Sequence, residues 1–267
     1  MTGPWSMQTM RNQFGYALCL GLGLVLIAGR AAAAPQARTA ADRPGQSPLR
    51  EARQAVLVIT DGWDTVAGTL QRFERADAAR SWKTVGSRVA AVVGKSGLAW
   101  GRGLRADPTS GPVKKEGDGK APAGVFRLAD VFGQSAERPA RLAMPYRFLG
   151  DNVECVDDGR STHYNELVTR QQVKAVDWTS SEKMWAEPLY KWGVVVQHNA
   201  GRPEPSGGSC IFLHIWRGPA SGTAGCTAMA ESDLLALIKW LDAGKSPTLV
   251  QLPRREYERL KSAWGLP

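Results

Sequence analysis

The sequence predicts a domain built mainly of β-strands with a few helices, the α+β class. Ten tryptophans and 29 glycines among 267 residues favour a turn-rich β architecture over a helical bundle. Short apolar segments recur along the chain, separated by Gly, Pro and Ser. Apolar residues fall at helical spacing over residues 234–241, and residues 254–264 predict a short surface helix. We expect one such domain over residues 55–267, without internal repeats.

The first part of this domain resembles a β-meander in its pattern. Four short segments predict its strands: residues 55–60, 68–75, 81–85 and 88–93. Gly86 and Ser87 separate the last two segments, which predicts a hairpin. The run 94–104 is spaced by glycines and predicts a loop. Residues 114–128 predict a second glycine-rich loop that leads into a strand.

The second part contains the strongest predicted strand, residues 192–198 (WGVVVQH). A loop over residues 199–209 returns the chain to a strand over 210–216. The two strands should pair antiparallel, which would bring His198 and His214 to one site. Residues 248–252 (TLVQL) predict a last strand.

Residues 209–229 (SCIFLHIWRGPASGTAGCTAM) combine a histidine on a strand with a cysteine on a connector before a helix. Alternation along the strand puts His214 on the face opposite the Ile and Leu side chains. A nearby imidazole can take the proton of a cysteine thiol, whose thiolate form is the nucleophile. Gly225 allows a tight turn that presents the N–H groups of Gly225 and Cys226 to an oxyanion. A buried structural cysteine with a core histidine is the alternative, and the pairing favours catalysis.

The N-terminus predicts export. Arg11 precedes the uncharged run 14–29, and four alanines (31–34) precede Pro35, so residues 1–34 have the pattern of a secretory signal peptide. The run is short for a membrane span, which makes an uncleaved anchor the weaker alternative. Residues 35–54 have little to bury and predict a disordered linker. We expect a periplasmic or cell-envelope protein without a stable membrane span after cleavage.

The charge excludes one class of partner. The formal net charge is +9, but the basic residues occur singly or in pairs. A nucleic-acid site would need a denser patch, so we expect no nucleic acid as a partner and at most a weak attraction to an anionic envelope polymer.

Three cysteines remain after the predicted leader, an odd number for an oxidising compartment. The favoured partition pairs Cys155 with Cys210 and leaves Cys226 reactive. The alternative is that all three are reduced.

Other polar residues carry weaker signals. Asp157 and Asp158 are adjacent, point apart on an extended chain and predict turn residues. A zinc hydrolase would use His163, His198, His214 or the cysteines, but no His-x-x-x-His or Cys-x-x-Cys spacing is present. We expect no metal and no cofactor.

The motif Thr223-Ala224-Gly225-Cys226, with His214 upstream on a strand, resembles the L,D-transpeptidase (YkuD-type) signature. Residues 116–126 (EGDGKAPAGVF) are similar to the GDGxTPxGxF element of the same domains. Two features depart from the family pattern. Ala228 stands where many members have arginine two residues after the nucleophile, and the spacing from His214 to Cys226 is shorter than in many relatives. The chain therefore resembles a divergent branch.

The resemblance implies a β-sandwich with a helix after the cysteine loop, Cys226 as nucleophile and His214 as base. It also implies peptidoglycan stem peptides as substrates: Cys226 attacks the amide before the terminal D-Ala, and an acceptor amine resolves the thioester. His198, Thr223, Trp216 and Tyr164 are the candidate substrate-binding residues. An L,D-carboxypeptidase that uses water, or an idle peptidoglycan-binding module, is the alternative.

Overall fold

The computed structural model describes residues 46–267. The predicted signal peptide (1–34) and residues 35–45 of the predicted linker lie outside the described residues. The rest of that linker is folded, contrary to expectation. Leu49 and Ala52 are buried in the core, and the Ser47 hydroxyl donates a 2.6 Å hydrogen bond to the Trp264 carbonyl. The apolar side chain of Leu49 joins this segment to the domain.

The described residues form thirteen strands and two α-helices. The strands are β1 (Gln54–Thr60), β2 (Ala67–Glu74), β3 (Lys83–Val92), β4 (Leu98–Trp100), β5 (Ala121–Gly133), β6 (Tyr146–Phe148), β7 (Val153–Val156), β8 (Leu167–Thr169), β9 (Ser181–Lys183), β10 (Trp192–Val196), β11 (Phe212–Ile215), β12 (Thr227–Met229) and β13 (Thr248–Pro253). The helices are α1 (Glu231–Trp240) and α2 (Arg254–Trp264). The fold is mostly β with two helices, which agrees with the predicted α+β class.

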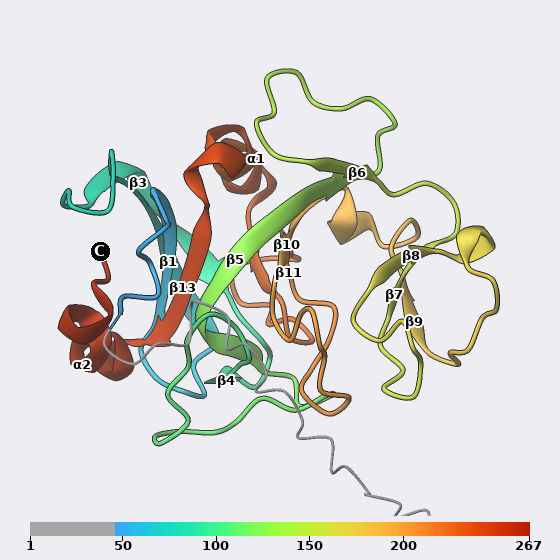
Figure 1. Cartoon of the computed structure of the whole chain (residues 1–267), viewed down its shortest axis with the longest axis horizontal. Coiled ribbons are helices and arrows are strands. Elements are labelled where there is room, and N and C mark those ends of the chain that lie inside the picture. Colours follow the sequence, from blue (N-terminus) through green and yellow to red (C-terminus); the bar gives the residue numbers. More distant parts are fainter. Residues whose placement is uncertain (1–45) are drawn as a thin grey trace, which may run out of the picture. The chain divides into compact units, whose positions relative to one another are not determined.

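Eight strands form one closed, barrel-like sheet, in place of the sandwich that the resemblance implied. Their order is β10-β11-β12-β3-β2-β1-β13-β5, and β5 pairs back with β10 (Figure 1). The length of β5 explains the closure. Its first part pairs with β13 from Gly124 to Arg127, and its second part pairs with β10 from Leu128 to Gly133. One strand therefore joins the two halves that a sandwich would keep as separate sheets.

Three local predictions were wrong. The two segments predicted over 81–85 and 88–93 fall largely within the single strand β3 (Lys83–Val92) and do not form a hairpin. Gly86 adopts φ 65° within it, and the β2–β3 register shifts between Leu70 and Arg72, which is how a strand absorbs an extra residue. The predicted loop 94–104 contains β4, and the predicted connector after Cys226 contains β12. Both strands have three residues, too few to show alternation.

Strands β4 and β6 also pair with β5, outside the ring of eight strands. The other three strands, β7, β8 and β9, form a separate small sheet in the order β8-β7-β9 (Figure 1). The main core lies within the closed sheet, where α1 contributes Leu234, Leu237 and Ile238. A second apolar cluster includes side chains of both sheets, among them Met184 after β9 and Phe212 of β11. The small sheet therefore packs on the strand that carries His214.

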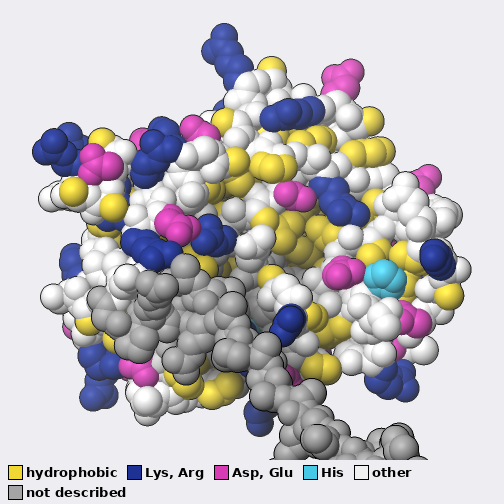
Figure 2. Space-filling view, in the orientation of Figure 1, with side chains coloured by type: hydrophobic (Ala, Val, Ile, Leu, Met, Phe, Trp, Pro, Cys, Tyr) yellow, Lys and Arg dark blue, Asp and Glu magenta, His cyan; other side chains and the backbone are white. Residues whose placement is uncertain are grey.

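Two expectations from the sequence concern the distribution of basic residues and the presence of a membrane span. Figure 2 shows Lys and Arg scattered over one face, with Asp and Glu between them. Neither helix within residues 46–267 is long and apolar enough to cross a bilayer.

Candidate active site

A cleft of about 470 Å³ contains Cys226 and His214. Its walls come from the loop before β5, the small sheet, the segment before β10, and the chain from β11 to β12. The side chains and backbone that line it include Lys114, Glu116, Asp157, Glu182, Glu187, Tyr190, Ser209, Cys210, His214, Trp216, Thr223, Gly225 and Cys226.

Strand pairing places Cys226 and His214 on one face of the sheet. β11 and β12 run parallel, with Leu213 opposite Thr227 and His214 opposite Ala228. Cys226 is two residues before Ala228, so its side chain lies on the same face as that of Ala228, next to the strand that carries His214. The sequence prediction that these two residues share a site is therefore consistent with the structure.

The Cys226 thiol is buried and uncharged. Its sulfur accepts a hydrogen bond from the Phe212 N–H at 3.2 Å, and the thiol donates to the Cys210 carbonyl at 3.4 Å. Burial raises the pKa of this thiol well above its ordinary value, and the Glu182 carboxylate raises it further. Cys226 is therefore a thiol, and formation of the thiolate needs a base.

The His214 ring is oriented for that task. Its Nδ1 lies 2.7 Å from the Ile215 carbonyl oxygen, which can only accept. Nδ1 therefore carries the hydrogen, and Nε2 is the nitrogen left to accept a proton. Burial lowers the pKa of His214, so the ring is neutral at neutral pH. Tyr190 fixes the ring from one side, with the ring centroids 5.2 Å apart.

The turn before Cys226 is held by Thr223. Its hydroxyl donates to the Cys226 carbonyl at 2.7 Å and accepts from the Gly225 N–H at 3.1 Å. The Gly225 N–H, which was predicted to serve an oxyanion, therefore already has a partner in the Thr223 hydroxyl. The lack of space for a side chain explains why residue 225 is glycine, because a Cβ there would lie 3.3 Å from the Lys120 carbonyl oxygen.

The four predicted substrate-binding residues separate into two groups. Thr223 and Trp216 line the cleft. His198 does not, which corrects the expectation that both histidines reach one site: its Nε2 is bonded to the Gly207 carbonyl at 2.9 Å. Tyr164 is buried behind the cleft and donates a hydrogen bond to Glu116.

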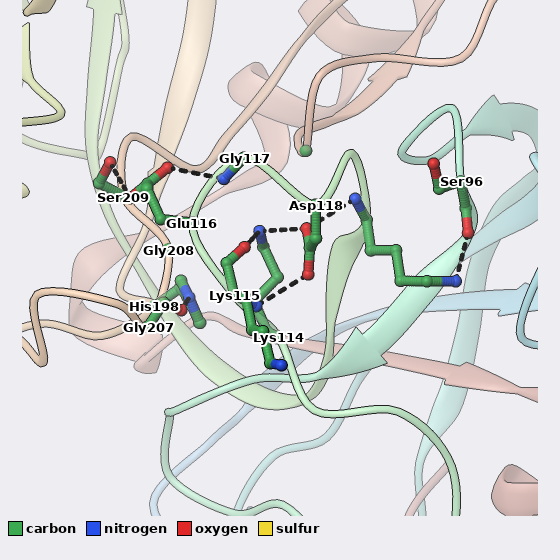
Figure 3. Close-up of polar contacts among 12 residues, drawn as sticks. Ser96, Lys114, Lys115, Glu116, Gly117, Asp118, His198, Gly207, Gly208 and Ser209 are labelled. Carbon is green, nitrogen blue, oxygen red and sulfur yellow. Dashed lines mark hydrogen bonds and ion pairs between the residues drawn. The ribbon is translucent and has the colours of Figure 1, made fainter.

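The glycine-rich loop before β5 forms one wall of the cleft through a connected polar network (Figure 3). Lys114 is buried, and its ammonium lies 2.6 Å from Asp118 Oδ1. Ser209, just before β11, donates to Glu116 Oε2 at 2.8 Å. The loop is thereby joined to the strand that carries His214.

Sequence reasoning missed the pair Glu182 and Tyr190. The Tyr190 hydroxyl donates a 2.5 Å hydrogen bond to Glu182 Oε2, and both residues line the cleft with Cys226. No local pattern selects these two side chains, because the register between β7 and β9 places Glu182.

The structure joins Cys155 and Cys210 in a disulfide with an S–S distance of 2.06 Å, the pairing favoured from the sequence, and Cys226 is free. Asp158 accepts hydrogen bonds from the N–H and hydroxyl of Thr179, the structural role expected of it. Within residues 46–267, no group of three or more His, Cys, Asp or Glu side chains is placed to hold a metal ion.

Comparison with known families agrees with this geometry. The YkuD family model, described as the L,D-transpeptidase catalytic domain, matches residues 69–250, more than half of the chain. The matched stretch includes the glycine-rich loop, His214 and Cys226. No curated protein and no solved structure matches the chain.

Proposed function

The chain belongs to the YkuD family of L,D-transpeptidase catalytic domains, and from this premise we propose that it is an exported acyltransferase that uses Cys226 to form a thioester with peptidoglycan stem peptides. Family membership supports an L,D-transpeptidase-type activity on peptidoglycan. The nucleophile, the base and the export are our proposals.

In the first step His214 Nε2 takes the proton of the Cys226 thiol as the sulfur attacks the carbonyl carbon before the terminal D-Ala. A C–S bond forms, the C–N bond breaks, and the amine of D-Ala leaves with the proton from His214. Because the buried thiol and the imidazole are both neutral and do not form an ion pair, proton transfer accompanies the attack.

The oxyanion of this step needs a donor near the sulfur. The Gly225 N–H is bonded to Thr223, so we assign the contact to the Cys226 N–H. Thr223 then has a positioning role, because it fixes the turn that presents this group.

The observation that carries the proposal is the arrangement of a free thiol and an imidazole with an available Nε2 in one cleft. A purely structural cysteine and histidine would have no need of a shared cavity. The predicted leader over residues 1–34 supports export to the periplasm or cell envelope.

Intact mass spectrometry of the purified protein with a disaccharide-tetrapeptide tests the proposal. We expect an acyl adduct lacking the terminal D-Ala on the wild type and none on Cys226→Ala. A folded wild-type protein that forms no adduct but binds peptidoglycan would overturn the proposal in favour of a binding module. Released tripeptide without cross-linked product would indicate the carboxypeptidase.

A further inference from the structure

Glu182 lies in the cleft but has no part in the acylation step. In the small sheet it is opposite Cys155, and the disulfide joins Cys155 to Cys210. The Cys210 carbonyl in turn accepts the hydrogen bond of the Cys226 thiol at 3.4 Å. Strand pairing and one covalent link therefore place the Glu182 carboxyl group near the nucleophile.

The Glu182 carboxylate has one occupied and one available oxygen. Oε2 accepts from the Tyr190 hydroxyl at 2.5 Å. Oε1 makes no hydrogen bond to any residue in the described part of the chain. Because Tyr190 also packs on His214 and is buried, the carboxylate is fixed in orientation beside the catalytic pair.

Asp157 supplies a second carboxylate to the cleft. Asp157 Oδ1 is buried without a hydrogen bond to any residue from 46 to 267. The buried cation in the cleft wall, Lys114, is paired with Asp118 and does not serve Asp157 or Glu182. A buried acceptor without a partner is unfavourable, so this side of the cleft is suited to a ligand that brings a cation and N–H donors.

We propose that Glu182 binds the ammonium group of the acyl acceptor and takes a proton from it, so that the enzyme selects a primary amine over water. The inference rests on the proposed function and deepens it, since it names the residues that receive the acceptor amine. A side-chain amine of a diamino acid has this chemistry. Asp157 contributes the second carboxylate of the same subsite.

Every proton released in the second step has an acceptor. The acceptor ammonium gives one proton to Glu182, and the resulting amine attacks the thioester carbonyl carbon. A C–N bond forms, the C–S bond breaks, and the second amine proton passes through His214 to the leaving Cys226 thiolate. Glu182 then releases its proton to water, and the thiol is restored.

The environment of Glu182 suits a group that must accept and release a proton. Burial raises the pKa of its carboxyl to about 7, and the nearby carboxylates of Asp157, Glu116 and Glu187 act in the same direction. The hydrogen bond from Tyr190 opposes this rise. A general base works best when its pKa lies near the operating pH.

The test measures how the acyl-enzyme is resolved in Glu182→Gln. The variant keeps the size and the acceptor oxygen for Tyr190. Full-length enzyme is supplied with the tetrapeptide donor and an amine acceptor, and cross-linked and hydrolysed products are separated by chromatography. We expect the ratio of cross-linked to hydrolysed product to fall by about 10²-fold. Both products arise from the same acyl-enzyme, so this ratio does not depend on the rate at which the adduct forms.

Two controls separate proton transfer from a structural effect. Glu166→Gln removes a carboxylate from the region of the small sheet outside this cleft, where Glu166 contacts His163 at 3.0 Å. It should leave the product ratio unchanged. Hydroxylamine, which is uncharged at neutral pH, needs no base before attack, so Glu182→Gln should use it as well as the wild type does.

The outcomes are distinct. No adduct on the wild type would overturn the proposed function and this inference together. Adduct formation with an unchanged product ratio in Glu182→Gln would overturn the inference alone. An equal loss with hydroxylamine would also overturn it, because the carboxylate would then act on structure and not on the acceptor proton.

Discussion

His198 and His214 occur in similar sequence contexts, but their rings differ in hydrogen bonding and in access to the cleft. Both are buried, and both lie at strands rich in Val, Leu and Phe. Strands β10 and β11 are neighbours, with Gly193 opposite His214. His198, however, lies beyond the end of β10, where the loop after it wraps around the ring.

The two histidines differ in the hydrogen bonds of their ring nitrogens. Nδ1 of His198 accepts from the Arg102 N–H at 3.2 Å, and Nε2 is bonded to the Gly207 carbonyl. Figure 3 shows His198 beside Gly207 and Gly208, below the glycine-rich loop. Among residues 46–267, His214 has a hydrogen-bond partner at Nδ1 and none at Nε2. A buried histidine with both nitrogens bonded supports structure, whereas one with a free nitrogen facing a cleft can transfer a proton.

The largest expected effect comes from removing the free nitrogen. His214→Gln should slow acyl-enzyme formation by about 10²–10⁴-fold, because the thiol loses its base. The rate is measured by intact mass in a single turnover, with His198→Gln as the matched control. A His214→Gln enzyme that acylates at the wild-type rate would remove the distinction between the two histidines.

The next effect concerns stability. His198→Ala should lower the free energy of unfolding by about 2–4 kcal/mol, since the Arg102 N–H and the Gly207 carbonyl lose their partner in a buried site. Urea denaturation of the full chain measures this change. Acylation per folded molecule should stay within about two-fold of the wild type. A large loss of acylation with unchanged stability would show that His198 acts in catalysis and not in stability.

Sequence reasoning predicted that Cys226 and His214 share one cleft because their signals are local. Alternation along β11 fixes the face of His214, and the Gly225-Cys226 turn follows a loop of Gly, Pro and Ser. The same local reasoning placed His198 wrongly. The pattern over residues 192–198 extends beyond Val196, where β10 ends, and it contains no information about the bonds that the loop makes to the ring.

The rest of the site depends on contacts between distant segments. Glu182 reaches the cleft through the β7–β9 register, and Tyr190 contacts it from the segment before β10. Closure of the sheet likewise depends on both halves of β5 finding different partners. No periodicity within a single segment predicts such pairings.

The smallest effect is a difference in pH dependence. Burial lowers the pKa of His198 from 6.5 to about 4, so between these values the unfolded state binds more protons than the folded state. Stability from this group is present above pH 6.5 and is lost as the pH falls toward 4. Glu182 acts oppositely: its pKa is raised from 4.5 to about 7, so its contribution falls as the pH rises through that window. The wild type alone would therefore show a partly cancelled profile.

Comparing variants isolates the histidine. From pH 7 to pH 5 the wild type should lose about 1–2 kcal/mol more stability than His198→Gln, because glutamine does not titrate while Glu182 is common to both proteins. Urea midpoints at the two pH values measure the difference. An identical loss in the two proteins would mean that the ring is protonated in the folded state near pH 6, and the two backbone bonds would then not define a neutral histidine.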